Sequence, residues 1–201
     1  EAVASRISKN LPNGLLGINI GPNKDTKNKE EDYFLCLSRL SSNAGYITIN
    51  ISSPNTEGLR DFHDQRELEK LLKGIENVKK QYNISKPIAI KLSPDIADNQ
   101  ISIIYELINK FNISGIIISN TTDKNRENLS DIKKSEAGGL SGQPLKEIST
   151  KLIKKFYKIT KGKTQIIGVG GVDSGQSAFE KISGGADVIQ LYTGMVFRGP
   201  G

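Results

Sequence analysis

Short apolar stretches recur along the chain, each followed by a polar or glycine-containing turn and an amphipathic segment. The stretches are apolar throughout rather than alternating, which is typical of strands buried on both faces of a parallel sheet. They predict six strands, at 15–20, 46–51, 87–92, 115–119, 165–169 and 187–191. Apolar positions at helical spacing predict the helices between them, at 30–42, 64–82, 98–111, 144–161 and 174–183. Strands alternating with helices indicate an α/β protein.

Two α/β architectures fit this alternation: an open, doubly wound sheet and a (β/α)8 barrel. Polar and glycine residues cluster directly after the predicted strands, which favours the barrel, because barrel chemistry lies on the loops at the carboxyl ends of the strands. A complete barrel has eight strands and typically about 250 residues. This chain has 201 residues, with no helix predicted after the sixth and last strand. Either the sheet is open or the sequence is cut.

Composition narrows the class of protein. The chain carries 28 Lys and Arg against 22 Asp and Glu, a formal charge of +6. Its lysine-rich segment, 151–163, has apolar positions at helical spacing and predicts a solvated helix face, and no zinc-ligand spacing or helix-turn-helix signal supports nucleic-acid binding. The single cysteine, Cys36, excludes a disulfide framework and is expected in the core. The single histidine, His63, is expected at the surface. No apolar run is long enough to span a bilayer, and no signal peptide opens the chain.

The densest candidate chemistry follows the second predicted strand. Asn50 ends that strand, Ser53 lies in the following Ser-Pro turn, and Asn55 comes directly after the turn. Two amides that each donate and accept suit a planar ligand with alternating N–H and C=O groups, and a hydroxyl between them can act as a nucleophile or base. The alternative is a plain turn, because serine, proline and asparagine are also the usual turn residues.

Two other strands carry polar groups at or near their ends. Lys91 lies in the apolar run 88–92, where a buried ammonium needs an anionic or carbonyl partner; alternatively, it lies at the exposed end of the strand. Ser119, Asn120 and Thr121 follow the fourth strand. These groups add to the amides and hydroxyls expected at the same edge of the sheet.

Glycines follow the last two predicted strands. Residues 168–171 are Gly-Val-Gly-Gly, and residues 192–194 are Tyr-Thr-Gly. Glycines let backbone N–H groups approach a phosphate closely, and barrel phosphate sites commonly lie on the last two strand-to-helix loops. These segments predict a phosphate site if the sixth strand corresponds to the eighth strand of a barrel.

Seven segments together resemble the membrane-associated, quinone-dependent class of dihydroorotate dehydrogenase. They are LGINIGPNKDT at 16–26, NISSPNTEGLR at 50–60, IAIKLSPD at 88–95, SNTT at 119–122, GGLSGQPL at 138–145, GVGGVDSGQSAFEKISGGAD at 168–187 and QLYTG at 190–194. They cover nearly the whole chain, in order and with family-like spacing. The resemblance implies an incomplete (β/α)8 TIM barrel, strands three to eight, as a single partial FMN-binding domain over residues 1–201.

The resemblance also implies a reaction and the residues that carry it. The family oxidises dihydroorotate to orotate, with FMN as the hydride acceptor. Ser53 is implied to be the general base, and because the soluble classes have cysteine there, the serine indicates the quinone-dependent class. Substrate contacts are implied for Asn50, Asn55, Asn120 and Thr121. FMN contacts are implied for Asn19, Asn50, Lys91, Ser119 (in place of the more usual threonine), Gly142, Gly170, Gly171, Tyr192 and Thr193.

Parts of the family pattern are not found in the chain. Membrane-facing helices, the quinone tunnel and two barrel strands would precede Glu1, whose place at the start predicts an excised piece. We therefore expect the whole protein to act in pyrimidine synthesis as a peripheral protein on the cytoplasmic face of the cell membrane. The isolated chain is expected to be soluble, poorly folded and inactive, with two unpaired sheet edges. The alternatives are another FMN-dependent pyrimidine oxidoreductase barrel or a non-catalytic remnant that keeps a binding role.

Overall fold

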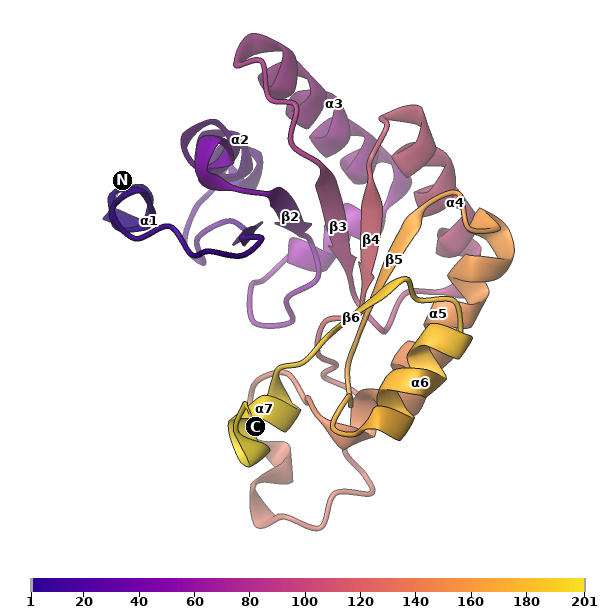
Figure 1. The fold of residues 1–201 in the computed structure, drawn as a ribbon. Helices are drawn as coiled ribbons and strands as arrows, with labels where there is room; N and C mark the ends of the chain where they lie inside the picture. Colours follow the sequence, from indigo (N-terminus) through magenta and orange to yellow (C-terminus); the bar gives the residue numbers. More distant parts are fainter. Residues whose placement is uncertain (1, 201) are drawn as a thin grey trace.

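The computed structural model describes residues 2–200 as six strands with helices between them, which confirms the predicted alternation (Figure 1). The strands are β1 (Gly17–Ile20), β2 (Tyr46–Asn50), β3 (Ile88–Leu92), β4 (Gly115–Ile118), β5 (Gln165–Val169) and β6 (Val188–Gln190). The helices that were predicted are α2 (Lys29–Leu40), α3 (Gln65–Gln81), α4 (Asp98–Lys110), α5 (Lys146–Thr160) and α6 (Gly175–Ser183). Their bounds differ from the predicted ranges by a few residues.

Two helices were not predicted. The first is α1 (Ala2–Lys9), and the second is α7 (Thr193–Arg198), which follows the last strand. The expectation that no helix follows that strand is therefore wrong. Six residues make fewer than two helical turns, too few for a hydrophobic period to be recognised.

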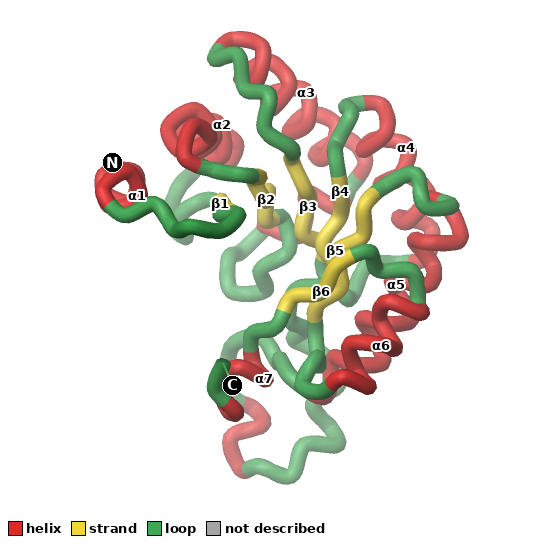
Figure 2. Tube along the Cα trace, viewed as in Figure 1, coloured by secondary structure: helices red, strands yellow, loops and turns green. Residues whose placement is uncertain are grey.

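The six strands form one parallel sheet in which every strand pairs with the next one along the chain. The sheet curls, with β1 and β6 at its two open edges and α2–α6 on its outer side (Figures 1 and 2). This arrangement is an incomplete (β/α)8 barrel, which confirms the fold that the family resemblance implied.

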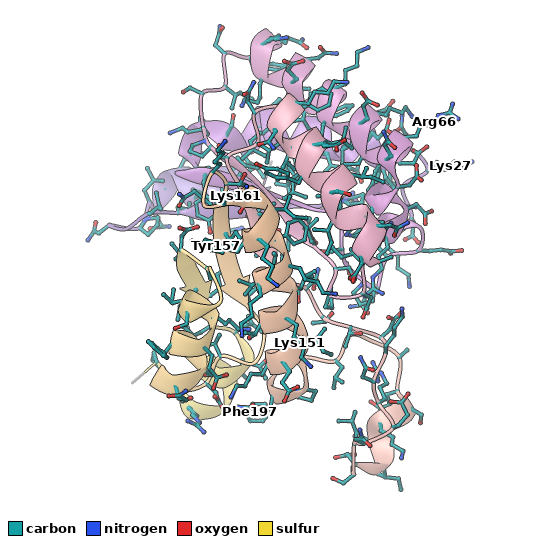
Figure 3. All side chains as sticks on the ribbon, turned by 90° about the vertical axis from the view of Figure 1, so that its right-hand side faces the viewer. Lys27, Arg66, Lys151, Tyr157, Lys161 and Phe197 are labelled. Carbon is teal, nitrogen blue, oxygen red and sulfur yellow. The ribbon has the colours of Figure 1, made fainter. Side chains whose placement is uncertain are left out.

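The core lies between the sheet and the outer helices. Each of these helices contributes residues at helical spacing, as in α3, which buries Leu68, Leu71, Leu72 and Ile75. The lysine-rich α5 buries Ile153 and turns its charged side chains outward (Figure 3). The +6 charge therefore includes a solvated helix face, as predicted.

Helix starts follow the expected chemistry. Asp64 caps α3 by accepting the N–H of Arg66 at 2.9 Å. Ser174 caps α6 by accepting the N–H of Ser177 at 3.2 Å. No helix between residues 2 and 200 has the length and apolarity needed to cross a membrane.

Candidate active site

The register of the sheet separates a helix-facing side from an inner side. Paired residues on neighbouring parallel strands point to the same face, and successive residues point to opposite faces. Gly168 faces the helices, because a Cβ there would lie 3.1 Å from the side chain of Ile153 on α5. Asn50 pairs with Lys91, in a row that reaches β5 at Ile167. Ile167 directly precedes Gly168, so this row points to the inner side.

Three polar side chains at the carboxyl ends of β2 and β4 form a hydrogen-bonded group that we call the amide cluster: Asn50, Ser52 and Asn120. Asn120 Nδ2 donates to Asn50 Oδ1 at 3.1 Å and to Ser52 Oγ at 3.0 Å. Ser52 Oγ donates to Asn50 Oδ1 at 3.0 Å. Tyr33, buried on α2, donates its hydroxyl to the Asn50 carbonyl at 2.5 Å. The cluster is therefore fixed before any ligand binds.

Ser53 and Asn55 lie in the turn beside the amide cluster. The N–H of Asn55 donates to Ser53 Oγ at 3.2 Å. Ser53 is half-buried and the Asn55 side chain is exposed. The turn thus leaves Ser53 within reach of solvent or a ligand, with one backbone donor directed at its hydroxyl oxygen.

A third loop packs on this turn and on the residue after Asn120. Gly139 lies so close to both that an added Cβ would be 3.1 Å from Pro54 and would overlap Thr121. The N–H of Thr121 donates to Asn120 Oδ1 at 2.8 Å. The structure therefore brings Asn50 and Asn120 into direct contact, with Ser53, Asn55 and Thr121 in the adjoining loops.

Arg60 ties the loops after β2, β3 and β4 to one another, and the sequence analysis did not single it out. Its guanidinium donates to the Thr121 carbonyl at 3.1 Å and pairs with Asp95 at 3.1 Å and with Asp123 at 2.8 Å. Its Nε reaches the Ser52 carbonyl at 3.5 Å. The hydrogen bond from Arg60 holds the pKa of Asp123 below its usual value. In the sequence, the place of Arg60 directly after Gly58 and Leu59, in the loop that follows β2, could have pointed to this role.

His63 is buried, so the expectation of a surface histidine is wrong. Its Nε2 accepts the N–H of Ser93 at 3.2 Å, so Nδ1 carries the proton and donates to the Arg60 carbonyl at 2.9 Å. Burial lowers the pKa of His63 below its ordinary value of 6.5. Both ring nitrogens are used to hold two loops together, which keeps the ring neutral. Cys36, which was expected in the core, is half-buried and packs against the core.

A cavity of about 520 Å³ adjoins the amide cluster. This volume is within the range of sites for small molecules and cofactors. Nine of the predicted site residues line it, in company with others from the same loops: Lys91, Ser119, Asn120, Thr121, Gly142, Gly170, Gly171, Tyr192 and Thr193. We call this cavity the glycine-lined pocket. Asn120 and Thr121 belong both to the pocket wall and to the amide side.

Glycines with positive φ values form the far end of this pocket. Gly170 and Gly171 follow β5 with φ values of +110° and +70°. A Cβ on Gly171 would lie 2.6 Å from Lys146 Cβ, and one on Gly142 would lie 3.1 Å from Thr193. Thr193 Oγ1 donates to Ser141 Oγ at 3.0 Å. The added Cβ atoms would collide with protein, so packing and the positive φ values require glycine here. The N–H groups of Gly170 and Gly171 donate no hydrogen bond within residues 2–200 and remain available to a ligand.

Lys91 and Asn19 occupy different environments on the inner side. Lys91 lies at the pocket wall and makes no hydrogen bond or ion pair with any other residue in the described range, and burial lowers the pKa of its ammonium. The sequence left two alternatives for Lys91: a buried ammonium with a partner, or an exposed place at the strand end. The structure lies between them, because Lys91 is half-buried and has no partner in the described range. Asn19 lies on the edge strand β1, paired with Thr48, and its side chain is exposed outside the pocket.

The sequence model of the dihydroorotate dehydrogenase family matches residues 1–201. The chain belongs to this family. A dihydroorotate dehydrogenase (quinone) from Psychrobacter sp. (strain PRwf-1) is 44% identical over 194 residues, which cover 93% of this chain and 56% of that protein. The enzyme of the same name from Vibrio parahaemolyticus is 41% identical over 208 residues, covering 100% of this chain and 62% of that protein.

Solved dihydroorotate dehydrogenases have the same fold as this chain. The enzyme from Eimeria tenella in complex with ferulenol superposes with a TM-score of 0.88 at 33% identity, over 99% of this chain and 58% of that one. Its ligand-free form superposes with a TM-score of 0.87 at 34% identity. The chain thus spans about three fifths of the length of these dihydroorotate dehydrogenases.

Membership of the dihydroorotate dehydrogenase family implies a flavin cofactor, and the glycine-lined pocket fits one. Its volume suits a cofactor, and the N–H groups of Gly170 and Gly171 donate no hydrogen bond within residues 2–200. Lys91 supplies an ammonium that no other residue between 2 and 200 engages. These features favour a flat ligand with an anionic end.

Proposed function

We propose that the full-length polypeptide in which this chain occurs oxidises dihydroorotate to orotate, with FMN as its cofactor and a quinone as the final electron acceptor, in pyrimidine biosynthesis. One observation carries this proposal: Asn120 belongs to both the amide cluster and the glycine-lined pocket. A flat pyrimidine at the cluster would therefore lie against a flavin in the pocket.

The residues of the pocket suit the two ends of FMN. Gly170 and Gly171 would receive the phosphate through their backbone, and Thr193 offers a hydroxyl beside them. Lys91 would face the ring system, where its unpaired ammonium stabilises negative charge. When bound, FMN supplies the hydride acceptor and passes the electrons to the quinone. The family resemblance also assigns Asn19 to the flavin, although its exposed side chain on β1 lies outside the pocket.

The amide side suits the ring of the substrate. Asn50 uses its Oδ1 within the cluster, while its Nδ2 donates no hydrogen bond within residues 2–200 and is therefore available to a ligand carbonyl. Asn55, Asn120 and Thr121 would supply further donors and acceptors around the same ring. Because the cluster is fixed by its own hydrogen bonds, substrate binding would require little reorganisation.

Ser53 is the proposed general base. Its Oγ would take a proton from one ring carbon while a hydride leaves the neighbouring carbon, so that a C=C bond forms between them. A serine needs help to accept a proton in this way. The Asn55 N–H that donates to Ser53 Oγ would stabilise negative charge on that oxygen as it exchanges protons.

The substitution Ser53→Ala tests this role in the full-length protein. We expect turnover of dihydroorotate to fall by about two to four powers of ten, because general base catalysis contributes that much. Flavin absorbance and orotate binding should remain unchanged, and the residual rate should rise with pH as hydroxide replaces the base. A rate near that of the wild type would refute the assignment.

An assay with a ubiquinone analogue, fumarate and NAD as acceptors would separate the quinone-dependent class from other FMN barrels.

We infer that residues 1–201 alone do not form a functional enzyme and that the whole protein is peripheral to the membrane. β1 and β6 are unpaired edges, and Val188, Tyr192 and Phe197 near the second edge are exposed apolar side chains. Circular dichroism and flavin absorbance of the 201-residue chain test the first inference. A cooperative melt with stoichiometric yellow FMN would overturn it. Restoring the flanking sequence without recovering turnover would instead favour a non-catalytic remnant.

A further inference from the structure

Lys181 on α6 is a fully buried lysine that the proposed reaction does not use. Its Nζ donates to Ser149 Oγ at 2.9 Å, to Thr150 Oγ1 at 3.2 Å and to the Lys146 carbonyl at 3.5 Å. All three acceptors are neutral oxygen atoms of α5. No carboxylate between residues 2 and 200 forms an ion pair with Lys181. Burying an ammonium without an anionic partner costs free energy, so Lys181 is expected to have a role that explains its burial at this position.

Ser149 connects this ammonium to the glycine turn of the pocket. Ser149 is buried, and its Oγ donates to the Val169 carbonyl at 2.5 Å. Because Lys181 donates to a lone pair of the Ser149 hydroxyl, the hydroxyl proton is directed at Val169. Val169 ends β5 and directly precedes Gly170. Lys181 thus fixes the residue from which the turn starts.

The packing places Lys181 directly behind that turn. A Cβ on Gly168 would lie 3.3 Å from Lys181 Cδ, and a Cβ on Gly170 would lie 3.3 Å from Ser149 Cβ. Gly168 faces the helices, whereas Val169 and Gly170 line the pocket. The ammonium and the ligand space therefore lie on opposite sides of one backbone segment.

The charged side chains around Lys181, behind the Gly170–Gly171 turn, have a net positive charge. Glu180 pairs with Lys146 at 3.1 Å, so Lys146, Glu180 and Lys181 together carry one net positive charge. Burial lowers the pKa of Lys181 to about 8, and Glu180 raises it in part, so the ammonium stays charged near pH 7. Asp173 also lines the pocket, but Ser177 donates to its carboxylate at 3.2 Å, Gln143 donates to it as well, and Arg198 approaches it at 3.8 Å.

We propose that Lys181 is a positioning residue for the Gly170–Gly171 turn and that its buried charge makes the pocket prefer a ligand with a phosphate at this turn. This inference rests on the proposed flavin site and extends it to a residue that does not touch the ligand. The backbone N–H groups recognise the phosphate, and the charge behind them strengthens that recognition because Lys181 and Ser149 are both buried.

The test compares FMN with riboflavin, which has the same ring and no phosphate. Dissociation constants for both would be measured by fluorescence titration of the apoprotein of the full-length polypeptide, in the wild type and in Lys181→Met. We expect FMN binding to weaken by at least about tenfold, while riboflavin binding changes by less than about twofold. Lys151→Met is the matched control, since it removes the same charge from the outer face of α5 (Figure 3), and it should leave both constants unchanged.

Equal weakening of FMN and riboflavin by Lys181→Met would overturn the inference, because it would show a purely structural role. An unchanged preference for FMN would overturn it as well. If Lys181→Met does not fold, Lys181→Gln keeps amide donors for Ser149 without the charge and should show the same loss of preference. Wild-type protein that binds neither flavin would refute the proposed function itself, and this inference with it.

Discussion

The amide cluster and the glycine-lined pocket meet at Asn120 but are built in opposite ways. In the cluster, Asn50, Ser52 and Asn120 bond to one another, and Arg60 fixes the loops that carry them. In the pocket, the N–H groups of Gly170 and Gly171 and the ammonium of Lys91 have no hydrogen-bond partner within residues 2–200. The comparison shows that protein contacts fix the geometry of the amide cluster, whereas the polar groups of the glycine-lined pocket are left free for a ligand.

The largest expected effect comes from adding a methyl group at the turn after β5, in Gly171→Ala. A Cβ there would lie 2.7 Å from Lys146 Cα and 2.8 Å from its nitrogen, at a φ of +70°. Backbone atoms cannot move aside as a flexible side chain can, so we expect a loss of about 2–3 kcal/mol in the free energy of unfolding and loss of flavin binding. Denaturant unfolding and flavin absorbance measure the two effects.

Gly162→Ala is the matched control for that substitution. Gly162 has a φ of +74°, but no atom lies within 4 Å of its added Cβ. The variant should lose only about 1–2 kcal/mol through backbone strain and keep its flavin. If both variants bound flavin equally well, the turn after β5 would not be part of the cofactor site.

A smaller effect is expected from removing the residue that fixes the amide side. Arg60→Ala breaks the contacts to Ser52, Thr121, Asp95 and Asp123. Misplaced catalytic loops should lower kcat by about ten- to a hundredfold. Flavin affinity should change little, because Arg60 does not line the pocket.

Steady-state kinetics and a flavin titration of the Arg60 variant separate the two halves of the site. Arg66→Ala, which removes an exposed arginine from α3, should leave both readouts at wild-type values (Figure 3). A parallel loss of turnover and flavin affinity in Arg60→Ala would contradict the division between cluster and pocket.

The smallest expected effect is a pH dependence from His63. Its pKa is lowered by burial, so the unfolded chain binds more protons than the folded one below pH 6.5. The stabilisation is therefore complete above about pH 6.5 and is lost as the pH falls through the folded pKa. The melting temperature should drop between pH 7 and pH 5, and the drop should be smaller in His63→Gln. An identical pH profile for the two proteins would exclude His63 as its source.

Sequence patterns predicted the strands and the long helices, because these depend on local periodicity, and they drew attention to glycine and amide residues directly after strands. The assignment of those residues to a flavin came from the family resemblance. Contacts between distant loops left no such signal. Arg60 and His63 each reach two or more loops, and neither type of contact follows from spacing along the chain. Lys181 resembles an ordinary surface lysine of an amphipathic helix, and only the packing of α6 on α5 shows that it is buried.

In the amide cluster, too, some features could be predicted from local sequence and others depend on contacts between distant segments. Residue types and strand ends predicted that Asn50 and Asn120 would lie close together, since parallel strands end at one edge of the sheet. The bond of the Asn50 carbonyl to Tyr33 could not be predicted, because Tyr33 comes from an earlier helix and has no pattern of its own.

The most direct test of the account is a crystal structure of the full-length polypeptide with FMN and orotate bound. The account predicts FMN in the glycine-lined pocket, with its phosphate at Gly170–Gly171, and orotate against its ring within hydrogen-bonding distance of Asn50 and Asn120. Ser53 Oγ should then face the orotate ring. Orotate bound away from the amide cluster, or FMN outside the pocket, would contradict it.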